Sequence, residues 1–272
     1  MRWLTSLGVL PALLVATAAS AAPSPYPFAE AVRVRDFLFL SGQIGIAPGA
    51  SAPVPGGVTA ETRQAMENIG ATLRKHGLGY RDLVKCTVML TDMSQWQALN
   101  RVYATYFPDG HFPARSAFGA AALALGAKVE IECLAQYSSR PEGINATTPL
   151  GPYSQAVRSG GTVYISGVVP FDAATGRFAA ADIASQMRQL LANLDAVLAA
   201  AGLDRSSIVK TTLFLRSASD MPAANAAYGA YFSGAPKPAR TTVAGADWGR
   251  PELIVEMDAV ADGSAKKVES ER

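Results

Sequence analysis

Two arginines lie in otherwise small, largely apolar segments, where each positive charge requires a negatively charged partner. Arg115 and Arg240 each open a short segment that is otherwise small and largely apolar, "PARSAF" and "PARTTV". A guanidinium has five N–H donors and cannot be neutralised by losing a proton, so it must be met by an anion. That anion could be a neighbouring carboxylate in an internal ion pair, which the residue type alone favours. It could also be a substrate carboxylate held by two parallel hydrogen bonds.

Acidic residues alternate with apolar ones further along each half of the chain. In "KVEIECLA" the period of a strand places Glu130 and Glu132 on one face, and in "IVEMDAVA" it places Glu256 and Asp258 on one face. Such pairs could simply be hydrated. If one of these acids shares a pocket with an arginine, however, the arginine could hold a carboxylate while the acid orients a water molecule.

Other chemistries have little support in the sequence. His76 and His111 are the only histidines, and we expect both at the surface and not as metal ligands. We find no G-x-S-x-G motif, no P-loop and no dinucleotide-binding fingerprint in a strand–helix context, so neither a metal nor an organic cofactor is expected. A net charge of +2, with no basic run ahead of the C-terminal tail, gives no basis for nucleic-acid binding.

The two halves of the chain are copies of each other. From Pro27 to Arg115 a constant offset of 125 residues (240 minus 115) relates them without a gap, and the second copy then gains one residue. Matches include Ser41-Gly42 with Ser166-Gly167, Val84-Lys85 with Val209-Lys210, Asn100 with Asn225, and Pro113-Ala114-Arg115 with Pro238-Ala239-Arg240. Matches in this order indicate a tandem duplication.

Each copy predicts the same order of elements. An apolar strand ("FLFLSG" or "TVYISG") leads through a loop to a helix, which is followed by a second strand, a second helix and two last strands. In the second copy Gly202 is expected to end the first helix. Its apolar residues recur at helical spacing: Leu190, Leu191, Leu194, Val197 and Leu198. We therefore expect two α+β domains, each a sheet with one face covered by two helices.

The ends of the chain differ from these copies. Arg2, the apolar run after it and the small residues near Ala21 or Ala22 are typical of a cleaved signal peptide, and the run is short for a membrane span. We expect a signal peptide at 1–22, domains at 23–137 and 148–262, a polar linker at 138–147 and a disordered tail at 263–272. The mature protein is expected to be exported to the periplasm, without a membrane anchor.

Both cysteines, Cys86 and Cys133, lie in the first copy within strand-like apolar runs. Buried cysteines in such runs are more often free thiols, which is the state we expect here. Export would permit a disulfide between them, and only their geometry decides between the two states.

The motifs as a set resemble a known family. "GPYSQAV", "VYISG", "IVKTTLFL", "NAAYGAYF", "PAR" and "VEMDAVA" look like the RidA (YjgF/YER057c/UK114) family of reactive-intermediate deaminases, and the resemblance covers both copies. It implies a chorismate-mutase-like α+β fold, trimers with clefts between neighbouring subunits, and hydrolysis of 2-enamines or 2-imines such as 2-aminoacrylate without a cofactor. It also implies that the "PAR" arginine binds the substrate carboxylate, that the first Glu of the "VEIE" run positions water, and that the Tyr of "GPY" lines the cleft.

Candidate site residues follow when these motifs are carried over to each copy. The glycines of the "SG" dipeptides, Gly42 and Gly167, are included as substrate-binding candidates. The second copy otherwise offers Tyr153, Asn225, Arg240 and Glu256, and the first offers Asn100, Arg115 and Glu130, with Phe28 in place of the tyrosine.

Each copy also departs from the family pattern. Ala117 and Thr242 stand where a cysteine often follows "PARS", and Gln43 of the first copy is replaced by Val168 in the second. Each copy is thus an incomplete version of the pattern.

The Tyr/Phe difference leads to a prediction about the clefts. Because a phenol donates a hydrogen bond and Phe28 cannot, the cleft with Tyr153, Arg240 and Glu256 is predicted to be the more active one. If the clefts instead mix residues of both copies, Tyr153 would complete the site around Arg115.

The function predicted from these residues and the resemblance is hydrolytic deamination. The substrate would be a small carboxylate-bearing 2-enamine or 2-imine, and the products a 2-oxo acid and ammonia. The alternative is a periplasmic protein that binds a small carboxylate without turnover, and one copy could also be only a scaffold for the other. Because the resemblance implies clefts between domains, we expect a homotrimer of three chains, with no nucleic-acid or membrane partner.

Overall fold

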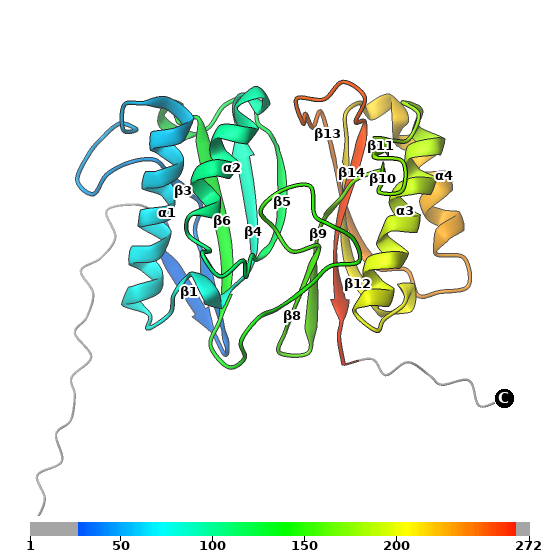
Figure 1. Cartoon of the computed structure of the whole chain (residues 1–272), viewed down its shortest axis with the longest axis horizontal. Coiled ribbons are helices and arrows are strands. Elements are labelled where there is room, and N and C mark those ends of the chain that lie inside the picture. The colour runs from blue at the N-terminus through cyan, green and yellow to red at the C-terminus, as the bar shows by residue number, and fades with distance from the viewer. Residues whose placement is uncertain (1–26, 265–272) are drawn as a thin grey trace, which may run out of the picture.

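The protein, seen in a computed structural model that describes residues 27–264, consists of two sheets with helices on their outer sides. Each sheet has six strands. The two sheets turn their helix-free faces toward each other at the centre of the molecule, and two long helices cover the outer face of each (Figure 1). The predicted α+β class and the tandem repeat are confirmed.

The first repeat forms the first sheet. In spatial order its strands are β1 (Ala31–Val34), β2 (Phe37–Leu40), β6 (Val129–Gln136), β4 (Leu83–Leu90) and β5 (Ala114–Gly119), and β3 (Gln43–Ile44) also pairs with β6. Strands β4 and β5 are parallel, and helix α2 (Trp96–Ala104) provides the crossover between them. Helix α1 (Gly57–Lys75) lies between β3 and β4 in the chain.

The second repeat forms the second sheet with the same plan. Its spatial order is β13 (Ala239–Ala244), β12 (Ile208–Leu215), β14 (Val255–Asp262), β9 (Thr162–Val168), β8 (Ala156–Ser159) and β7 (Glu142–Ile144). Its long helices are α3 (Ile183–Ala200) and α4 (Met221–Tyr231), and β10 (Phe171–Asp172) and β11 (Arg177–Phe178) form a separate small hairpin. Register is shared between the repeats, because Lys85 pairs with Ala114 and Lys210 pairs with Ala239.

Short 3-10 helices lie at the ends of several of these elements. They are η1 (Tyr80–Asp82), η2 (Met93–Gln95), η3 (Ala124–Gly126), η4 (Arg205–Ser207) and η5 (Ala218–Asp220). Helix α3 shows how the local sequence fixes the elements. The Asp182 carboxylate accepts a hydrogen bond from the Ser185 N–H at its start, and Gly202 adopts a left-handed φ of 71° just beyond its end, as predicted. The leucine and valine stripe predicted for this helix is buried against its sheet.

A separate apolar cluster joins the two repeats. Val84 and Ala114 of the first sheet pack with Val157 and Tyr164 of the second. The backbone of Ala114 also pairs with that of Ser154 in an isolated parallel bridge. The edge of the first sheet at β5 is therefore packed against the opening strands of the second repeat.

The structure has a disulfide between Cys86 and Cys133 in place of the expected free thiols. Strands β4 and β6 place Cys86 directly opposite Cys133, with Cα atoms 4.1 Å apart, and the two sulfurs form a disulfide with an S–S distance of 2.07 Å. The pairing depends on the register of two strands that are far apart in the sequence, which the composition of each strand does not specify.

Part of the predicted linker is a strand of the second sheet. Residues 142–144 within it form β7, which pairs with β8 and so extends the second sheet. The predicted signal peptide and residues 265–272 of the predicted tail lie outside the described residues. Within residues 27–264 no helix combines the length and the apolar character needed to cross a membrane.

Candidate active site

Arg115 lies at the junction of the two repeats. It is the second residue of β5 and only 3% exposed, and its backbone N–H donates to Ser166 Oγ of the second repeat at 2.7 Å. Its guanidinium carbon lies 4.5 Å from the ring centre of Trp96, 4.9 Å from that of Tyr103 and 5.5 Å from that of Tyr153. The cation is therefore held among aromatic rings contributed by both repeats.

The Arg115 side chain has donors that the protein does not use. Both terminal nitrogens, Nη1 and Nη2, are buried and have no hydrogen-bond partner among the described residues. Burial lowers the pKa of Arg115, while Tyr103, Tyr153 and Glu256 act against this shift. Because a buried unpaired charge is costly, two parallel free donors indicate a site for an anion such as a carboxylate.

Glu256 is the acidic residue of the same region. It lies on β14 and is 4% exposed. Burial, followed by the nearby negative charge of Asp258, raises its pKa to about 8, while Trp248, Lys85 and Arg115 oppose this shift. The side chain is therefore mostly protonated at neutral pH, and it can donate a proton as well as accept one.

Gly167 explains how the Glu256 carboxyl reaches its position. The carboxyl lies directly over this glycine, so a Cβ atom there would overlap Glu256 Oε1. The first repeat has the same arrangement, in which a Cβ atom at Gly42 would overlap Glu130 Oε1. The glycine of each "SG" dipeptide thus makes room for the acid of its own repeat.

Tyr153 closes the site from the loop before β8. Its hydroxyl accepts a hydrogen bond from the Leu150 N–H at 3.4 Å, and burial raises the pKa of its phenol, which keeps it a donor. Beside it, a Cβ atom at Gly151 would lie 3.3 Å from Arg115 Nη2 and 3.5 Å from Asn100 Nδ2. Asn100 is itself buried, and its Oδ1 has no partner among the described residues.

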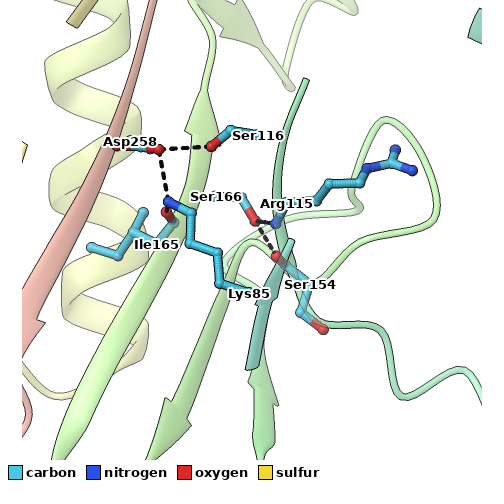
Figure 2. A network of polar contacts seen from close by, with 7 residues as sticks. All are labelled: Lys85, Arg115, Ser116, Ser154, Ile165, Ser166 and Asp258. Carbon is cyan, nitrogen blue, oxygen red and sulfur yellow. Dashed lines mark hydrogen bonds and ion pairs between the residues drawn. The ribbon is translucent and has the colours of Figure 1, made fainter. Parts of the chain in front are cut away.

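A polar network fixes the two repeats against each other next to this site. Lys85 Nζ of the first repeat lies 2.7 Å from Asp258 Oδ2 of the second, and both side chains are largely buried. Ser116 Oγ donates to the same carboxylate oxygen at 2.8 Å, and Ser166 Oγ donates to the Ser154 carbonyl at 2.6 Å. Figure 2 shows the Arg115 side chain extending away from this network.

A cavity of about 170 Å³ lies between the two repeats and contains the buried charges. Arg115, Tyr153 and Glu256 line it together with Gly167. The remainder of its wall is mostly apolar and includes Trp96, Phe171, Phe178, Trp248 and Leu253. The cavity thus offers a carboxylate-binding end, a proton donor and an apolar wall.

The predicted grouping of Tyr153 and Glu256 with Arg240 is therefore wrong. The structure brings them together with Arg115, which is the alternative arrangement that mixes the copies. The reason is that β5 of the first repeat packs against the second repeat, whereas β13 is exposed. Arg240 instead lies over the Tyr228 ring at 4.7 Å, and its Nη2 donates to Asn225 Oδ1 at 2.8 Å.

Glu130 and Phe28 are not part of this site. Phe28 is 54% exposed, and Glu130 is half-buried, with its pKa raised by burial and then by Glu132. Neither residue lines the cavity that contains Arg115. Among the described residues, Glu130, Phe28 and Arg240 do not form a common site.

Some residues of the site were not predicted. The Lys85–Asp258 ion pair and the aromatic wall depend on contacts between repeats, for which one copy of the sequence gives no signal. Trp96 and Trp248 could have been noticed as large aromatic residues, because the chain contains only three tryptophans. Within residues 27–264 no cluster of three His, Cys, Asp or Glu residues could hold a metal ion.

Comparison with known proteins agrees with the two-repeat organisation. A family model described as endoribonuclease L-PSP matches residues 19–137 and again residues 143–262. The 2-iminobutanoate/2-iminopropanoate deaminase of Mus musculus is 43% identical over 109 residues, which are 40% of this chain and 80% of the mouse protein. A RutC family protein of Pyrococcus horikoshii is 38% identical over 117 residues, 43% of this chain and 91% of that protein.

Solved structures match in the same way. The yjgF gene product of E. coli is 38% identical and covers 44% of this chain and 98% of its own, with a TM-score of 0.41. A putative endoribonuclease of Thermotoga maritima is 38% identical and covers 44% of this chain and 93% of its own, also with a TM-score of 0.41. The chain belongs to the endoribonuclease L-PSP family, in which its relatives carry RidA and RutC names, and it contains two copies of the family's domain in tandem.

Proposed function

We propose that the cavity between the repeats hydrolyses small 2-imino acids, or the 2-enamines that tautomerise to them, to a 2-oxo acid and ammonia. One observation carries the proposal: the two unpaired donors of buried Arg115 line the same cavity as the buried carboxyl group of Glu256. Burial raises the pKa of this carboxyl group to about 8, which favours its acid form. The names of the relatives as 2-iminobutanoate/2-iminopropanoate deaminases support the same chemistry.

The size of the cavity favours small substrates. A cavity of about 150 Å³ is enough to hold benzene, and the cavity here is about 170 Å³. 2-Iminopropanoate has as many non-hydrogen atoms as benzene, so the cavity is large enough to hold it, and larger side chains would have to extend along the apolar wall.

The chemical steps use groups that are already in place. Arg115 binds the carboxylate through two hydrogen bonds and so fixes the position of the imine carbon. Glu256 donates its proton to the imine nitrogen and then accepts one from the water that forms the new C–O bond. Glu256 then gives this proton to the amine nitrogen and its carboxylate accepts the proton of the new hydroxyl group, so that the C–N bond breaks, ammonia leaves and the carbonyl of the 2-oxo acid forms.

Tyr153 has a supporting part in this scheme. Its protonated phenol lies beside the guanidinium, where it can donate a hydrogen bond to the substrate carboxylate or to the attacking water.

The test is ammonia release from 2-iminopropanoate generated in the assay by an amino acid oxidase. Wild-type protein is expected to accelerate release over the spontaneous reaction, and Glu256→Gln is expected to lose most of this acceleration while retaining the fold. If the wild-type protein binds pyruvate but does not accelerate release, the site binds carboxylates without turnover and the proposal fails.

We further propose that the chain is exported to an oxidising compartment such as the periplasm. The Cys86–Cys133 disulfide supports this, because disulfides persist mainly in such compartments. Fractionation of the producing cells, followed by a thiol count on the isolated protein, would test both the location and the bond.

A further inference from the structure

Trp248 reaches the cavity from a loop that differs between the repeats. It belongs to residues 245–254, which connect β13 to β14. The side chain is 7% exposed and lines the cavity together with Arg115 and Glu256. The matching connection in the first repeat, residues 120–128, is one residue shorter and contains no tryptophan. Trp248 is therefore a feature of the second repeat, which also supplies the acid of the site.

Arg216 holds this loop in a defined conformation. Its guanidinium donates hydrogen bonds to the carbonyls of Leu253 at 3.0 Å and Arg250 at 2.7 Å. It also donates to the Asp247 carboxylate at 3.1 Å, and its central carbon lies 5.9 Å from the centre of the Trp248 ring. The base of the loop and the tryptophan are thus supported by one side chain.

The loop also contacts the first repeat. The Gly119 N–H donates to the Asp247 carbonyl at 2.7 Å. Gly249 has a left-handed φ of 64°, and a Cβ atom there would lie only 3.0 Å from Met93 Cβ. Because the loop is fixed to both repeats, the indole has a defined position in the cavity wall.

The indole N–H of Trp248 is a donor without a regular partner. Its Nε1 is buried and has no hydrogen-bond partner among the described residues. Burial and the charge of Asp258 raise the pKa of Glu256, and the Trp248 N–H is the largest of the influences that lower it. The N–H is thus near enough to the Glu256 carboxyl to favour its ionised form, although the two do not form a hydrogen bond of regular geometry.

A donor in this position suits the carboxylate better than the acid. An indole can only donate, and a hydrogen bond to an ionised acceptor is about twice as strong as one between neutral groups. In the reaction proposed above, Glu256 gives its proton to the imine and becomes a buried carboxylate. A buried donor beside it would then gain the partner that it lacks while Glu256 is protonated.

We propose that Trp248 is a positioning residue whose indole N–H donates to the Glu256 carboxylate formed when the imine is protonated. It holds this carboxylate in place for the proton transfers that follow. This role rests on the proposed function, and it makes the site depend on a loop residue for which the first repeat has no counterpart.

The other charged and titratable groups that face Glu256 come from several elements. Asp258 lies on the same strand, Lys85 on β4, Arg115 on β5 and Tyr153 in the loop before β8. Lys85 and hydrogen bonds lower the pKa of Asp258 against the effect of its burial, whereas burial raises the pKa of Tyr153. Neither of these two therefore changes its charge near pH 8.

NMR of the wild-type protein without substrate tests the pair directly. The ¹⁵N-indole resonance of Trp248, identified by its absence in Trp248→Phe, is expected to move downfield as the pH rises through about 8. The movement should be missing in Glu256→Gln, which cannot become a carboxylate. A Trp248 resonance that stays constant while the Glu256 carboxyl titrates would overturn the proposal.

Trp248→Phe tests the effect of the donor on the acid. It keeps an aromatic ring and removes the N–H, so the Glu256 titration, followed by ¹³C NMR of labelled glutamate carboxyl groups, should move upward by about one pH unit. The fall of kcat/KM with pH should move with it, and kcat/KM at neutral pH should be about tenfold lower.

Trp96→Phe is the matched control. It removes the indole N–H of the tryptophan that lies over Arg115 in the same cavity wall, and it should leave the Glu256 titration unchanged. An unchanged Glu256 midpoint in Trp248→Phe, or an equal shift in Trp96→Phe, would overturn the role of Trp248. Both titrations use protein without substrate, so ammonia release without a coupled titration would remove Trp248 from the mechanism and leave the proposed function intact.

Discussion

At the scale of single residues, the site is defined by two buried ionisable groups that differ in charge and in hydrogen bonding. Arg115 has donors that have no partner among the described residues, whereas burial raises the pKa of Glu256 to about 8 and so favours its acid form. An incoming carboxylate satisfies the arginine, and a neutral acid beside it avoids repulsion of that carboxylate. Together they suit a substrate that brings one negative charge and needs one proton.

The raised pKa of Glu256 predicts a pH dependence. The acid form is the one that protonates the imine, and it is present below a pKa of about 8. We therefore expect kcat/KM to fall, by up to tenfold per pH unit, as the pH rises through about 8. Glu256→Gln cannot titrate, so its residual activity should lack this decline. A wild-type profile that instead rises through pH 8 would contradict the assigned role.

Gly167 allows a matched pair of variants. In Gly167→Ala the new methyl group would displace the Glu256 carboxyl, which is the movable end of a side chain. We expect kcat/KM to fall by about 10²-fold, because small misplacements of catalytic groups are costly, while the free energy of unfolding changes by about 1 kcal/mol or less. Gly42→Ala causes the same overlap with Glu130, outside the cavity, and should retain most activity. Equal losses in the two variants would contradict the assignment.

The sequence predicted which residues are candidates for the site, but it did not predict which of them lie together. Arg115 and Glu256 could be identified from the sequence because an arginine in a small apolar strand and acids on one strand face are unusual. That Glu256 serves Arg115 and not Arg240 follows from the packing of one repeat against the other. Three of the four residues in the apolar cluster between the repeats, Val84, Ala114 and Val157, have identical counterparts in the other repeat, so the sequence does not indicate which copies meet.

The disulfide distinguishes the two repeats at the scale of secondary structure elements. It joins β4 to β6 in the first sheet, whereas the second sheet has Thr211 and Ala259 at the corresponding pair. The element order, the helix stripe of α3 and its end at Gly202 were predicted because they depend on local sequence. The cysteine pairing and β7 were not, because they depend on strand register and on which edge is free.

Removal of the disulfide should therefore lower the free energy of unfolding without changing the residues that line the cavity. Cys86→Thr/Cys133→Ala introduces the residues that the second repeat has at these positions. The bond joins residues 47 apart, and we expect the variant to lose about 2–4 kcal/mol of unfolding free energy in a denaturant titration. Wild-type protein measured in reductant should match the variant. An unchanged denaturation midpoint would show that the bond is not formed in solution.

At the scale of the whole molecule, the duplication allows one chain to build a complete cavity from two domains. The first repeat contributes the arginine, and the second contributes the acid and the phenol. The Lys85–Asp258 ion pair joins the two repeats next to the cavity (Figure 2). Arg240 and Glu130 are the counterparts of Arg115 and Glu256, and neither of them lines this cavity. The two halves of the chain therefore have the same fold and contribute different residues to the cavity.

The most direct test of this account compares the two arginines. Ammonia release from 2-iminopropanoate should be measured for the wild type, Arg115→Ala and Arg240→Ala under identical conditions. Loss of a buried charged partner costs several kcal/mol, so Arg115→Ala is expected to lower kcat/KM by about 10²–10³-fold, while Arg240→Ala lowers it by less than about tenfold. A larger loss in Arg240→Ala than in Arg115→Ala would contradict a catalytic cavity between the two repeats of one chain.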